Sequence, residues 1–276
     1  MGRLISWNTA GRTRRAAAQI AWIAERSPDV VALQEVTASS RIILRAELAR
    51  IGLAQQVDTF DLGPPQGTLG PRRYGLLLAS RVPWSAAALG SETMPWPERV
   101  ISARQPAAHG ELELFSVHVP PGSSNGWMKV EIFEGLFALL ARPATGARIL
   151  CGDFNSPQYE LNDGSVVTWG QRLRPDGSVV VKRSIRRRAG ERWDAAERSV
   201  LVGLAEHDLC DAFRGLHGYG REAFSWLARG SRPQGRRFDH MFASASLDLL
   251  GCEYLHAPRL AGLSDHSALE ATFSGL

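Results

Sequence analysis

The stretch "CGDFNSPQ", residues 151–158, follows the apolar pair Ile149 and Leu150 near the middle of the chain. Gly, Asp, Asn and Pro favour tight turns, so the segment reads as the end of a buried strand. The same residues place a carboxylate and an amide, Asp153 and Asn155, where a sheet would hold them rigidly at its rim. Taken alone, the stretch fits a structural turn and a catalytic turn equally well.

Around this stretch the chain alternates between two kinds of apolar pattern. The helical spacing of apolar residues predicts helices at 13–26, 37–51, 126–140 and about 193–204. Runs rich in β-branched and apolar residues predict strands at 3–8, 29–36, 74–80, 111–119, 147–155, 223–228, 236–244, 247–255 and 267–273. Because the alternation is irregular, unlike that of a doubly wound sheet, we expect an α/β fold in which mixed sheets pack face to face with helices outside.

No repeat, low-complexity tract or Pro/Ser-rich linker interrupts the sequence, and we expect residues 1–276 to form one domain. Residues 165–192 read as an insertion, in which two β-rich runs around Pro175-Asp176-Gly177 predict a hairpin. The basic loop "KRSIRRRAGER" (182–192) follows, with six basic residues and one Glu. Arginine binds phosphate in a bidentate manner, so this loop favours a nucleic-acid or polyphosphate partner, with a solvated exposed loop as the alternative. Its candidate contacts are Arg186, Arg187 and Arg188.

The composition narrows the class of protein. With 276 residues, 44% of them hydrophobic and 22% charged, the chain can bury a large core, which excludes disordered and fibrous classes. No apolar run approaches the roughly 18 residues of a membrane helix, and the N-terminus lacks a signal-like pattern, so we expect a cytoplasmic protein without membrane association. No motif for an obligate protein partner is visible.

Acidic, amide and histidine residues recur where strands are expected to end. They are Asn8, Glu35, His118, Asp153, Asn155, Asp239, Asp265 and His266. Each has an ordinary structural explanation as a cap, an exposed strand-end charge or a core histidine. Together they contain what metal-assisted phosphoryl chemistry requires. A hard ion such as Mg²⁺ takes carboxylate and amide oxygens, which Glu35 and Asn8 offer. A second carboxylate can align a water, and a histidine held by a carboxylate can stabilise charge on phosphorus.

Six motifs in order carry a resemblance to a known family. They are "ISWNTAG", "PDVVALQEV", "FSVHVP", "CGDFNSP", "RRFDHMFAS" and "LSDHSALEATF". In this order, and over residues 4–273, they resemble the endonuclease/exonuclease/phosphatase superfamily. The segment "ERSVLVGLAEHDLCDAFR", followed by "FSW" and "RRFDHMFAS", is similar to the exonuclease III type of apurinic endonuclease within it.

The resemblance implies a four-layer α/β sandwich that binds Mg²⁺, or alternatively Mn²⁺, and hydrolyses phosphoester bonds. It implies that Glu35 is the main metal ligand, with Asn8 beside it and Asp265 assisting. It further implies that Asp153 aligns or activates the attacking water and that Asn155 holds the scissile phosphate. His266, oriented by Asp239, would contact the phosphate and stabilise the transition state.

Two positions depart from the exonuclease III pattern. His118 stands where that branch usually has a tyrosine, and a histidine there is more like the deoxyribonuclease I and phosphatase branches, where it can act as a general acid. Trp226 and Phe238 match the walls of an abasic-sugar pocket, but Arg236 replaces an expected apolar residue. Asn125, in the polar loop "PPGSSNGWMK" together with Lys129, is a further candidate phosphate donor.

Three functional hypotheses follow. The first is a metal-dependent DNA nuclease of the exonuclease III or apurinic endonuclease type, for which the arginine-rich loop would neutralise phosphates. The second is a phosphatase or phosphodiesterase of a small phosphoester such as a nucleotide, an inositol phosphate or a lipid headgroup, which His118 and Arg236 favour. The third is a catalytically silent nucleic-acid-binding module, which an intact set of polar residues disfavours.

Overall fold

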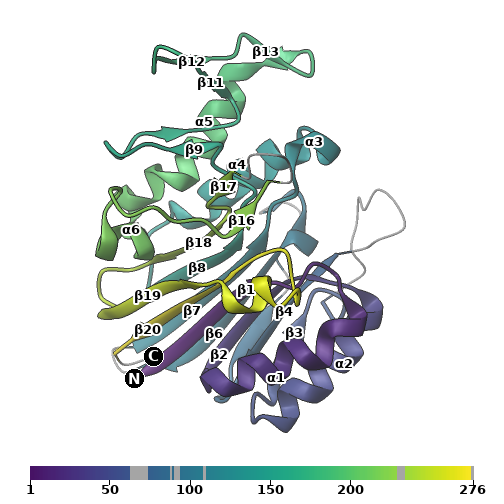
Figure 1. The fold of residues 1–276 in the computed structure, drawn as a ribbon. Coiled ribbons are helices and arrows are strands. Elements are labelled where there is room, and N and C mark those ends of the chain that lie inside the picture. Colours follow the sequence, from purple (N-terminus) through teal and green to yellow (C-terminus); the bar gives the residue numbers. More distant parts are fainter. Residues whose placement is uncertain (63–73, 88, 90–93, 108–109, 229–233, 275–276) are drawn as a thin grey trace.

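The computed structural model describes residues 1–62, 74–87, 89, 94–107, 110–228 and 234–274 (Figure 1). Its framework is two six-stranded sheets, each combining parallel and antiparallel neighbours. The first sheet has the order β19-β20-β1-β2-β4-β3, and only the β1·β2 pair is parallel. Its strands are β1 (Gly2–Asn8), β2 (Val30–Val36), β3 (Gln55–Asp58), β4 (Gly75–Ser80), β19 (Leu249–Leu255) and β20 (Ala268–Phe273).

The second sheet has the order β15-β18-β8-β7-β6-β5. Its parallel pair is β7·β8, in which His118 lies opposite Asp153, while β18 runs antiparallel to β8 with Asp239 opposite Asp153. The register therefore gathers three polar strand ends at one rim. The strands are β5 (Ser85–Ala87), β6 (Val100–Ala107), β7 (Gly110–His118), β8 (Ala147–Asp153), β15 (Cys210–Asp211) and β18 (Asp239–Ala243).

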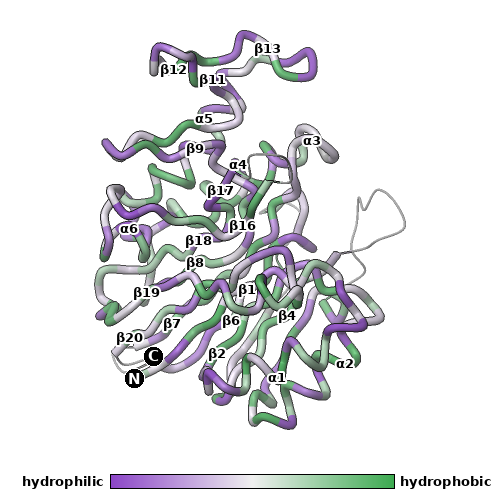
Figure 2. The backbone as a smooth tube through the Cα atoms, viewed as in Figure 1, coloured by the Kyte–Doolittle hydropathy of each residue, from purple (hydrophilic) through white to green (hydrophobic). Residues whose placement is uncertain are grey.

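Helices cover the outer face of each sheet. The first sheet packs against α1 (Ala16–Arg26) and α2 (Ala38–Arg50), and the second against α4 (Met128–Leu140) and α5 (Gly190–Leu201). A third apolar cluster, containing Leu4, Leu114 and Met241, fills the space between the sheets. Figure 2 shows the matching apolar stretches along the central strands. The expected sandwich of two mixed sheets between helical layers is confirmed.

The burial of these elements explains their sequence patterns. Six of the seven residues of β2 are buried because the sheet is covered on both faces, which is why the strand reads as a continuous apolar run. Helix α2 begins at a capping box, in which Thr37 accepts from the Ser40 backbone N–H and Ser40 accepts from that of Thr37. Within the described residues, no helix combines the length and apolar character needed to cross a membrane.

Several boundaries differ from those expected. The predicted helix at 13–26 starts as a 3-10 turn, η1 (Thr13–Arg15), and the one at 193–204 runs from Gly190 to Leu201 and is followed by η3 (Gly203–His207). Strands β3, β5 and β6 were not anticipated, because β3 and β5 are short and β6 contains Arg104, Gln105 and Pro106. The remaining helices are η2 (Pro97–Arg99), α3 (Gly122–Asn125), α6 (Ala212–His217) and α7 (Ala257–Leu260).

The insertion at 165–192 contains the expected hairpin, formed by β11 (Gln171–Leu173) and β12 (Val179–Val181). Val166 and Val167 lie outside it, because they form β10 and pair with β9 (Tyr159–Glu160). The supposed basic loop is partly ordered as a second hairpin of β13 (Ser184–Ile185) and β14 (Arg188–Ala189). In Figure 1, β11, β12 and β13 lie beyond α5, away from α1 and α2. A last small pair is β16 (Trp226–Leu227) with β17 (Gly235–Arg236).

Gly152 allows β7 and β8 to approach closely beside the rim. Its φ is +141°, and a Cβ there would lie 2.0 Å from the Val117 carbonyl oxygen. We therefore expect Gly152→Ala to lower the free energy of unfolding by about 3 kcal/mol, through backbone strain and overpacking. Urea titration measures this change, with Gly215→Ala as the control, because a Cβ added at Gly215 would meet no atom within 4 Å outside the backbone of its own helix. Equal stability of the two variants would contradict the close packing of β7 on β8.

Candidate active site

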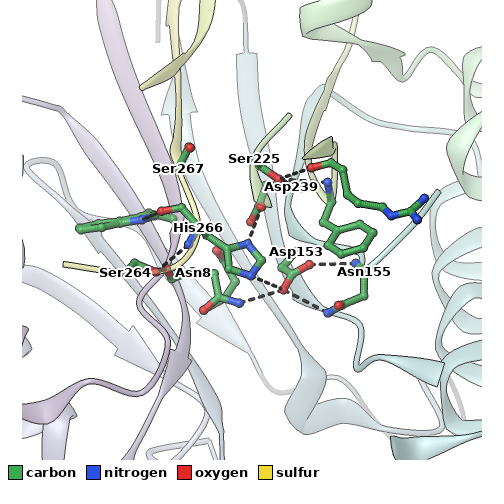
Figure 3. A network of polar contacts seen from close by, with 12 residues as sticks. Asn8, Asp153, Asn155, Ser225, Asp239, Ser264, His266 and Ser267 are labelled. Atoms are coloured by element: carbon green, nitrogen blue, oxygen red, sulfur yellow. Dashed lines mark hydrogen bonds and ion pairs between the residues drawn. The ribbon is translucent and has the colours of Figure 1, made fainter. Parts of the chain in front are cut away.

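The predicted polar residues meet where strands of the two sheets end. Asn8 ends β1, His118 ends β7, Asp153 ends β8 and Asp239 begins β18, while Glu35 lies in β2. Asp265 and His266 follow α7 in the loop before β20. Side chains from both sheets and from positions 8 to 266 thus converge on one place, which Figure 3 shows from close by.

Asp153 is the centre of this cluster and is fully buried. Its Oδ2 accepts from Asn8 Nδ2 at 2.8 Å and from Asn155 Nδ2 at 3.1 Å. Its Oδ1 accepts from the Asn155 backbone N–H at 2.8 Å. The carboxylate is therefore fixed in position by three donors, and the turn that follows β8 is tied to it.

Asp239 and His266 form a tight pair beside Asp153. His266 Nδ1 lies 2.7 Å from Asp239 Oδ2, and its Nε2 lies 4.0 Å from Asp153 Oδ2. Burial opposes the charge on His266, but Asp239 and Asp153 outweigh it and raise the pKa of His266 to about 10. The ring is thus a cation, and its Nε2–H is directed towards Asp153. The backbone is held as well, because Trp7 Nε1 donates to the His266 carbonyl at 3.0 Å.

The carboxylates of the cluster are crowded and poorly solvated. Burial, followed by repulsion from Asp239, raises the pKa of Asp153 to about 7. Burial also raises the pKa of Glu35, although His266 and a hydrogen bond from Asn8 act in the opposite direction. Negative groups in such surroundings are stabilised by a cation between them.

Glu35 is presented by a distortion of β2. The pairing of β2 with β4 shifts register between Leu33 and Val36, and Glu35 has a φ of +53°. A bulge of this kind redirects a side chain at the end of a strand, and strain in a non-glycine residue is typical of functional positions. Its Oε1 lies 3.7 Å from His118 Nε2, so the bulge brings the carboxylate into the cluster.

His118 is buried, and a second residue sets its protonation. Arg99 Nη1 lies 3.2 Å from His118 Nδ1, so Nδ1 accepts and the hydrogen of the neutral ring lies on Nε2. Burial, together with the charges of Arg99 and His266, holds the pKa of His118 well below its ordinary value of 6.5. Nε2 has no hydrogen-bond partner among the described residues. The ring is therefore a neutral donor aimed at the cluster.

The cluster offers ligands for a cation. In two groups, Glu35–His118–Asp153 and Asp153–Asp239–His266, one candidate atom of each side chain lies within 4.8 Å of the others. The carboxylates are the groups free to bind an ion, because Nε2 of both histidines carries a hydrogen and Nδ1 of each already contacts Arg99 or Asp239. Asp239 Oδ1 is buried and also lacks a partner among the described residues. Two carboxylates with raised pKa values and unpaired buried atoms fit a divalent ion with oxygen ligands.

Asn155 is held by a network that the sequence did not reveal. It has a φ of +48°, and its carbonyl accepts from Lys129 Nζ at 2.7 Å and from Trp169 Nε1 at 2.9 Å. Its amide nitrogen donates to the Val119 carbonyl at 2.9 Å. Both the backbone carbonyl and the side-chain amide of Asn155 are therefore held in place by hydrogen bonds.

Glu197 organises the residues beneath this turn. It accepts from Trp193 Nε1 at 2.7 Å and from the Trp169 backbone N–H at 2.9 Å, and it lies 3.7 Å from Lys129 Nζ. Lys129 is therefore buried and structural, and its interpretation as a free phosphate donor in the polar loop was wrong. Lys129 lies on the buried side of α4, where its side chain faces Glu197.

A cleft of about 630 Å³ opens beside the cluster. Predicted residues in its lining are Glu35, Asp153, Asn155, Arg186, Trp226, Arg236, Phe238, Asp265 and His266. Trp226 and Phe238 stack with ring centroids 5.4 Å apart. Arg187 and Arg188 are exposed outside this lining, and Arg188 lies over Trp127 instead. Asn125 ends α3, and its side chain lies outside the described residues.

Sequence reasoning missed Arg99, Trp169 and Glu197. Arg99 is the last residue of the short 3-10 helix η2, and nothing in "WPER" distinguishes it from a surface arginine. Trp169 lies in the first of the two β-rich runs of the insertion, where an aromatic residue reads as strand or core. For Glu197 one signal was available, because it is an acidic residue on the apolar face of the helix predicted at 193–204.

Comparison with known proteins agrees with the two-sheet fold. A model of the Endonuclease/Exonuclease/phosphatase family matches residues 5–266. An AP endonuclease from Archaeoglobus fulgidus has a similar structure, with a TM-score of 0.71 and 22% identity over 99% of this chain and 100% of that one. Among the curated proteins compared, none matches the chain in sequence.

Two further solved structures share the fold. The 3′ phosphatase NExo from Neisseria, bound to a product DNA hairpin, has a TM-score of 0.66 and 20% identity, covering 99% of this chain and 100% of that one. A humanized TDP2 of D. rerio has a TM-score of 0.63 and 15% identity, covering 99% and 98%. The family model spans nearly the whole chain, and the two-sheet fold agrees with it. The chain therefore belongs to the endonuclease/exonuclease/phosphatase family, whose members are hydrolases of phosphoester bonds.

Proposed function

We propose that the protein is a divalent-metal-dependent hydrolase of phosphodiester bonds in DNA, of the exonuclease III or apurinic endonuclease type. The observation that carries the proposal is the buried Asp239–His266 pair, which directs a cationic ring towards Asp153 at the floor of an open cleft. A carboxylate and an imidazolium that lie side by side in a cleft can address a water and a phosphate together.

Each residue of the cluster has a task in this mechanism. Asp153 aligns the attacking water and takes up its proton, for which a pKa of about 7 suits it. His266 donates through Nε2 to a phosphate oxygen and stabilises the negative charge that develops on phosphorus. Asp239 keeps the proton on His266 Nδ1, so that the ring cannot turn away from the cleft.

Mg²⁺, or alternatively Mn²⁺, would be held by Glu35 and Asp265 with Asn8 beside them. When bound, the ion supplies positive charge that offsets the charge of the phosphate and favours ionisation of a water. Asn8 also has a role of its own, because its Nδ2 orients Asp153 while its Oδ1 accepts from the Ala10 backbone N–H at 2.9 Å.

Asn155 and His118 complete the phosphate site in this proposal. Both amide hydrogens of Asn155 have acceptors within the protein, the Val119 carbonyl oxygen and Asp153 Oδ2. Donation to a phosphate oxygen would therefore replace the longer contact with Asp153. His118 would contribute as a neutral Nε2–H donor, because Arg99 occupies its other nitrogen.

DNA is the proposed substrate for three reasons. Solved structures of similar fold include an AP endonuclease and a phosphatase bound to a DNA hairpin. The cleft contains the aromatic pair Trp226 and Phe238, and it also contains Arg186 and Arg236. Aromatic planes and guanidinium groups beside a phosphate site suit a nucleic acid strand.

A second candidate is a phosphatase or phosphodiesterase of a small phosphoester. Arg236 favours it, because this residue lines the cleft and places a charged guanidinium there, whereas a dry apolar wall would suit an abasic sugar. A substrate panel separates the two candidates. Abasic duplex, plain duplex, single-stranded DNA, RNA and a generic phosphomonoester are each incubated with protein and Mg²⁺, with chelator controls. Cleavage of DNA supports the proposal, whereas turnover of the phosphomonoester alone would overturn it.

Loss of the Glu35 carboxylate should weaken metal binding directly. We expect Glu35→Gln to raise the dissociation constant for Mn²⁺ by at least about tenfold. Loss of a residue that only orients a metal ligand already weakens metal affinity by about 10–100-fold, and loss of a ligand should cost no less. Titration followed by the electron paramagnetic resonance of free Mn²⁺ measures this without any substrate. Glu206→Gln is the matched control, since Glu206 is exposed outside the cleft. Equal affinities in the two variants would remove Glu35 from the ligand set.

A further inference from the structure

The cleft has a second wall, which comes from the insertion at 165–192. Trp169, Ile185 and Arg186 belong to it, and they face the same space as Asp153 and Asn155. An aromatic plane and a guanidinium group therefore lie in one cleft with the residues that would handle a phosphate. The volume of about 630 Å³ falls in the range of about 300–1,000 Å³ that is usual for pockets enclosing a small organic ligand.

Trp169 is fixed in place at three points. Its backbone N–H donates to Glu197 at 2.9 Å, its carbonyl accepts from Lys182 Nζ at 2.8 Å, and its Nε1 donates to the Asn155 carbonyl at 2.9 Å. A side chain held in this way loses little freedom when a ligand stacks on it. Because the indole is tied to Asn155, a planar group resting on it would lie next to the proposed phosphate position.

The positively charged guanidinium of Arg236 lies over the ring of Trp169. Its guanidinium carbon lies 5.3 Å from the centroid of the Trp169 ring, and Nη2 donates to Gln234 Oε1 at 3.0 Å. Nη1 donates to the Gln158 carbonyl. An arginine beside a tryptophan is well suited to the π-face and polar edge of a nucleobase and poorly suited to a dry sugar pocket.

Arg186 is held beside the cleft by a strained turn. The two residues between β13 and β14, Arg186 and Arg187, have φ values of +48° and +67°. Two-residue hairpin turns with positive φ at both positions favour Asn-Gly, and other residues adopt them at a cost in stability. Strain of this kind is typical of functional positions. The turn brings Arg186 Nη2 to the Ser123 carbonyl, and Ser123 also lines the cleft.

We propose that this second wall is a subsite for one base-bearing nucleotide of a DNA strand. Trp169 stacks on the base next to the scissile phosphate, Arg236 contacts the base edge, and Arg186 binds the neighbouring phosphate. The inference rests on the proposed function and narrows it, because the substrate then keeps its base beside the bond that is cleaved.

The test compares two single-stranded oligonucleotides of equal length, one intact and one built entirely of base-less tetrahydrofuran nucleotides. Fluorescence anisotropy with the Asp153→Asn protein gives the dissociation constants without turnover. We expect the intact strand to bind about tenfold more tightly, in line with one base stacked on an aromatic side chain. Trp169→Leu should abolish this preference, whereas Trp169→Phe should retain most of it. Both variants lose the bond to the Asn155 carbonyl, so their difference reports stacking alone.

A second pair of variants tests the turn. Arg186→Asn combined with Arg187→Gly gives the turn its preferred residues, so the melting temperature should rise while strand binding weakens and becomes less dependent on salt. Arg174→Ala is the control, because Arg174 is an exposed arginine of the insertion outside the cleft lining. Unchanged affinity in the turn variant would overturn the role of Arg186.

The outcomes separate the subsite from the proposed reaction. Equal affinity for intact and base-less strands, or a base preference that survives Trp169→Leu, would overturn the subsite even if the wild-type protein hydrolyses DNA. A base preference that depends on Trp169 would support the subsite even if the wild-type protein with Mg²⁺ cleaved no phosphodiester, in which case the proposed function alone would fail.

Discussion

Asp153→Asn is expected to lower the rate of phosphodiester cleavage by about 10³-fold, which lies within the range of about 10²–10⁴ that a single general base usually contributes. The variant keeps the shape of the side chain but can neither take up a proton nor present a charge to the water. Single-turnover kinetics with saturating protein isolate this step from product release.

The fold should survive this change. Asparagine occupies the same volume, and removal of a buried negative charge compensates in part for the altered contacts with Asn8 and Asn155. We expect the far-ultraviolet circular dichroism spectrum to be unchanged and the melting temperature to shift by only a few degrees. Asp163→Asn is the control, because Asp163 is exposed and bonds only locally to Ser165. A variant at Asp153 that matched this control in rate would show that the assignment of the water-aligning carboxylate is wrong.

His266→Ala is expected to lower the rate to a similar extent, by about 10²–10³-fold, because it removes the preorganised donor for the developing negative charge. Asp239 acts through His266, which it holds at 2.7 Å. The two residues should therefore behave as one unit. A double-mutant cycle tests this directly, since residues in one network give effects that do not add.

In this cycle, Asp239→Asn should slow the reaction on its own but add little to His266→Ala. Protein stability and strand affinity serve as the accompanying measurements, because a merely structural effect of either change would appear there. His207→Ala is a suitable control, since His207 packs on Phe137 in the layer outside the second sheet. If the rate of the double variant instead fell by the full product of the two single reductions, Asp239 would have a task separate from His266.

The sequence predicted the rim cluster well because strand ends are visible in apolar patterns. "DVVALQEV" and "ARILCGDFN" mark where β2 and β8 end, and the polar residues at those ends had to meet at a rim. The pairing of Asp239 with His266 was not visible in any pattern, since 27 residues separate them. It came from the family resemblance.

Other features depend on packing that a linear pattern does not encode. The inward turn of Lys129 follows from the phase of α4 against α5, and the tautomer of His118 follows from Arg99, which lies 19 positions earlier. The β13–β14 hairpin was read as a loop because Arg-Arg is an unusual pair for such a turn. In these cases tertiary contacts override local preference.

The central claim is that Asp153 and its neighbours hydrolyse phosphodiester bonds with a divalent ion. The most direct measurement is the single-turnover cleavage of end-labelled DNA by chelator-treated protein, with and without added Mg²⁺, for wild type and Asp153→Asn side by side. We expect cleavage by the wild-type protein only when Mg²⁺ is present, and almost none by the variant. Cleavage that persisted in excess chelator, or equal rates for the two proteins, would contradict the claim.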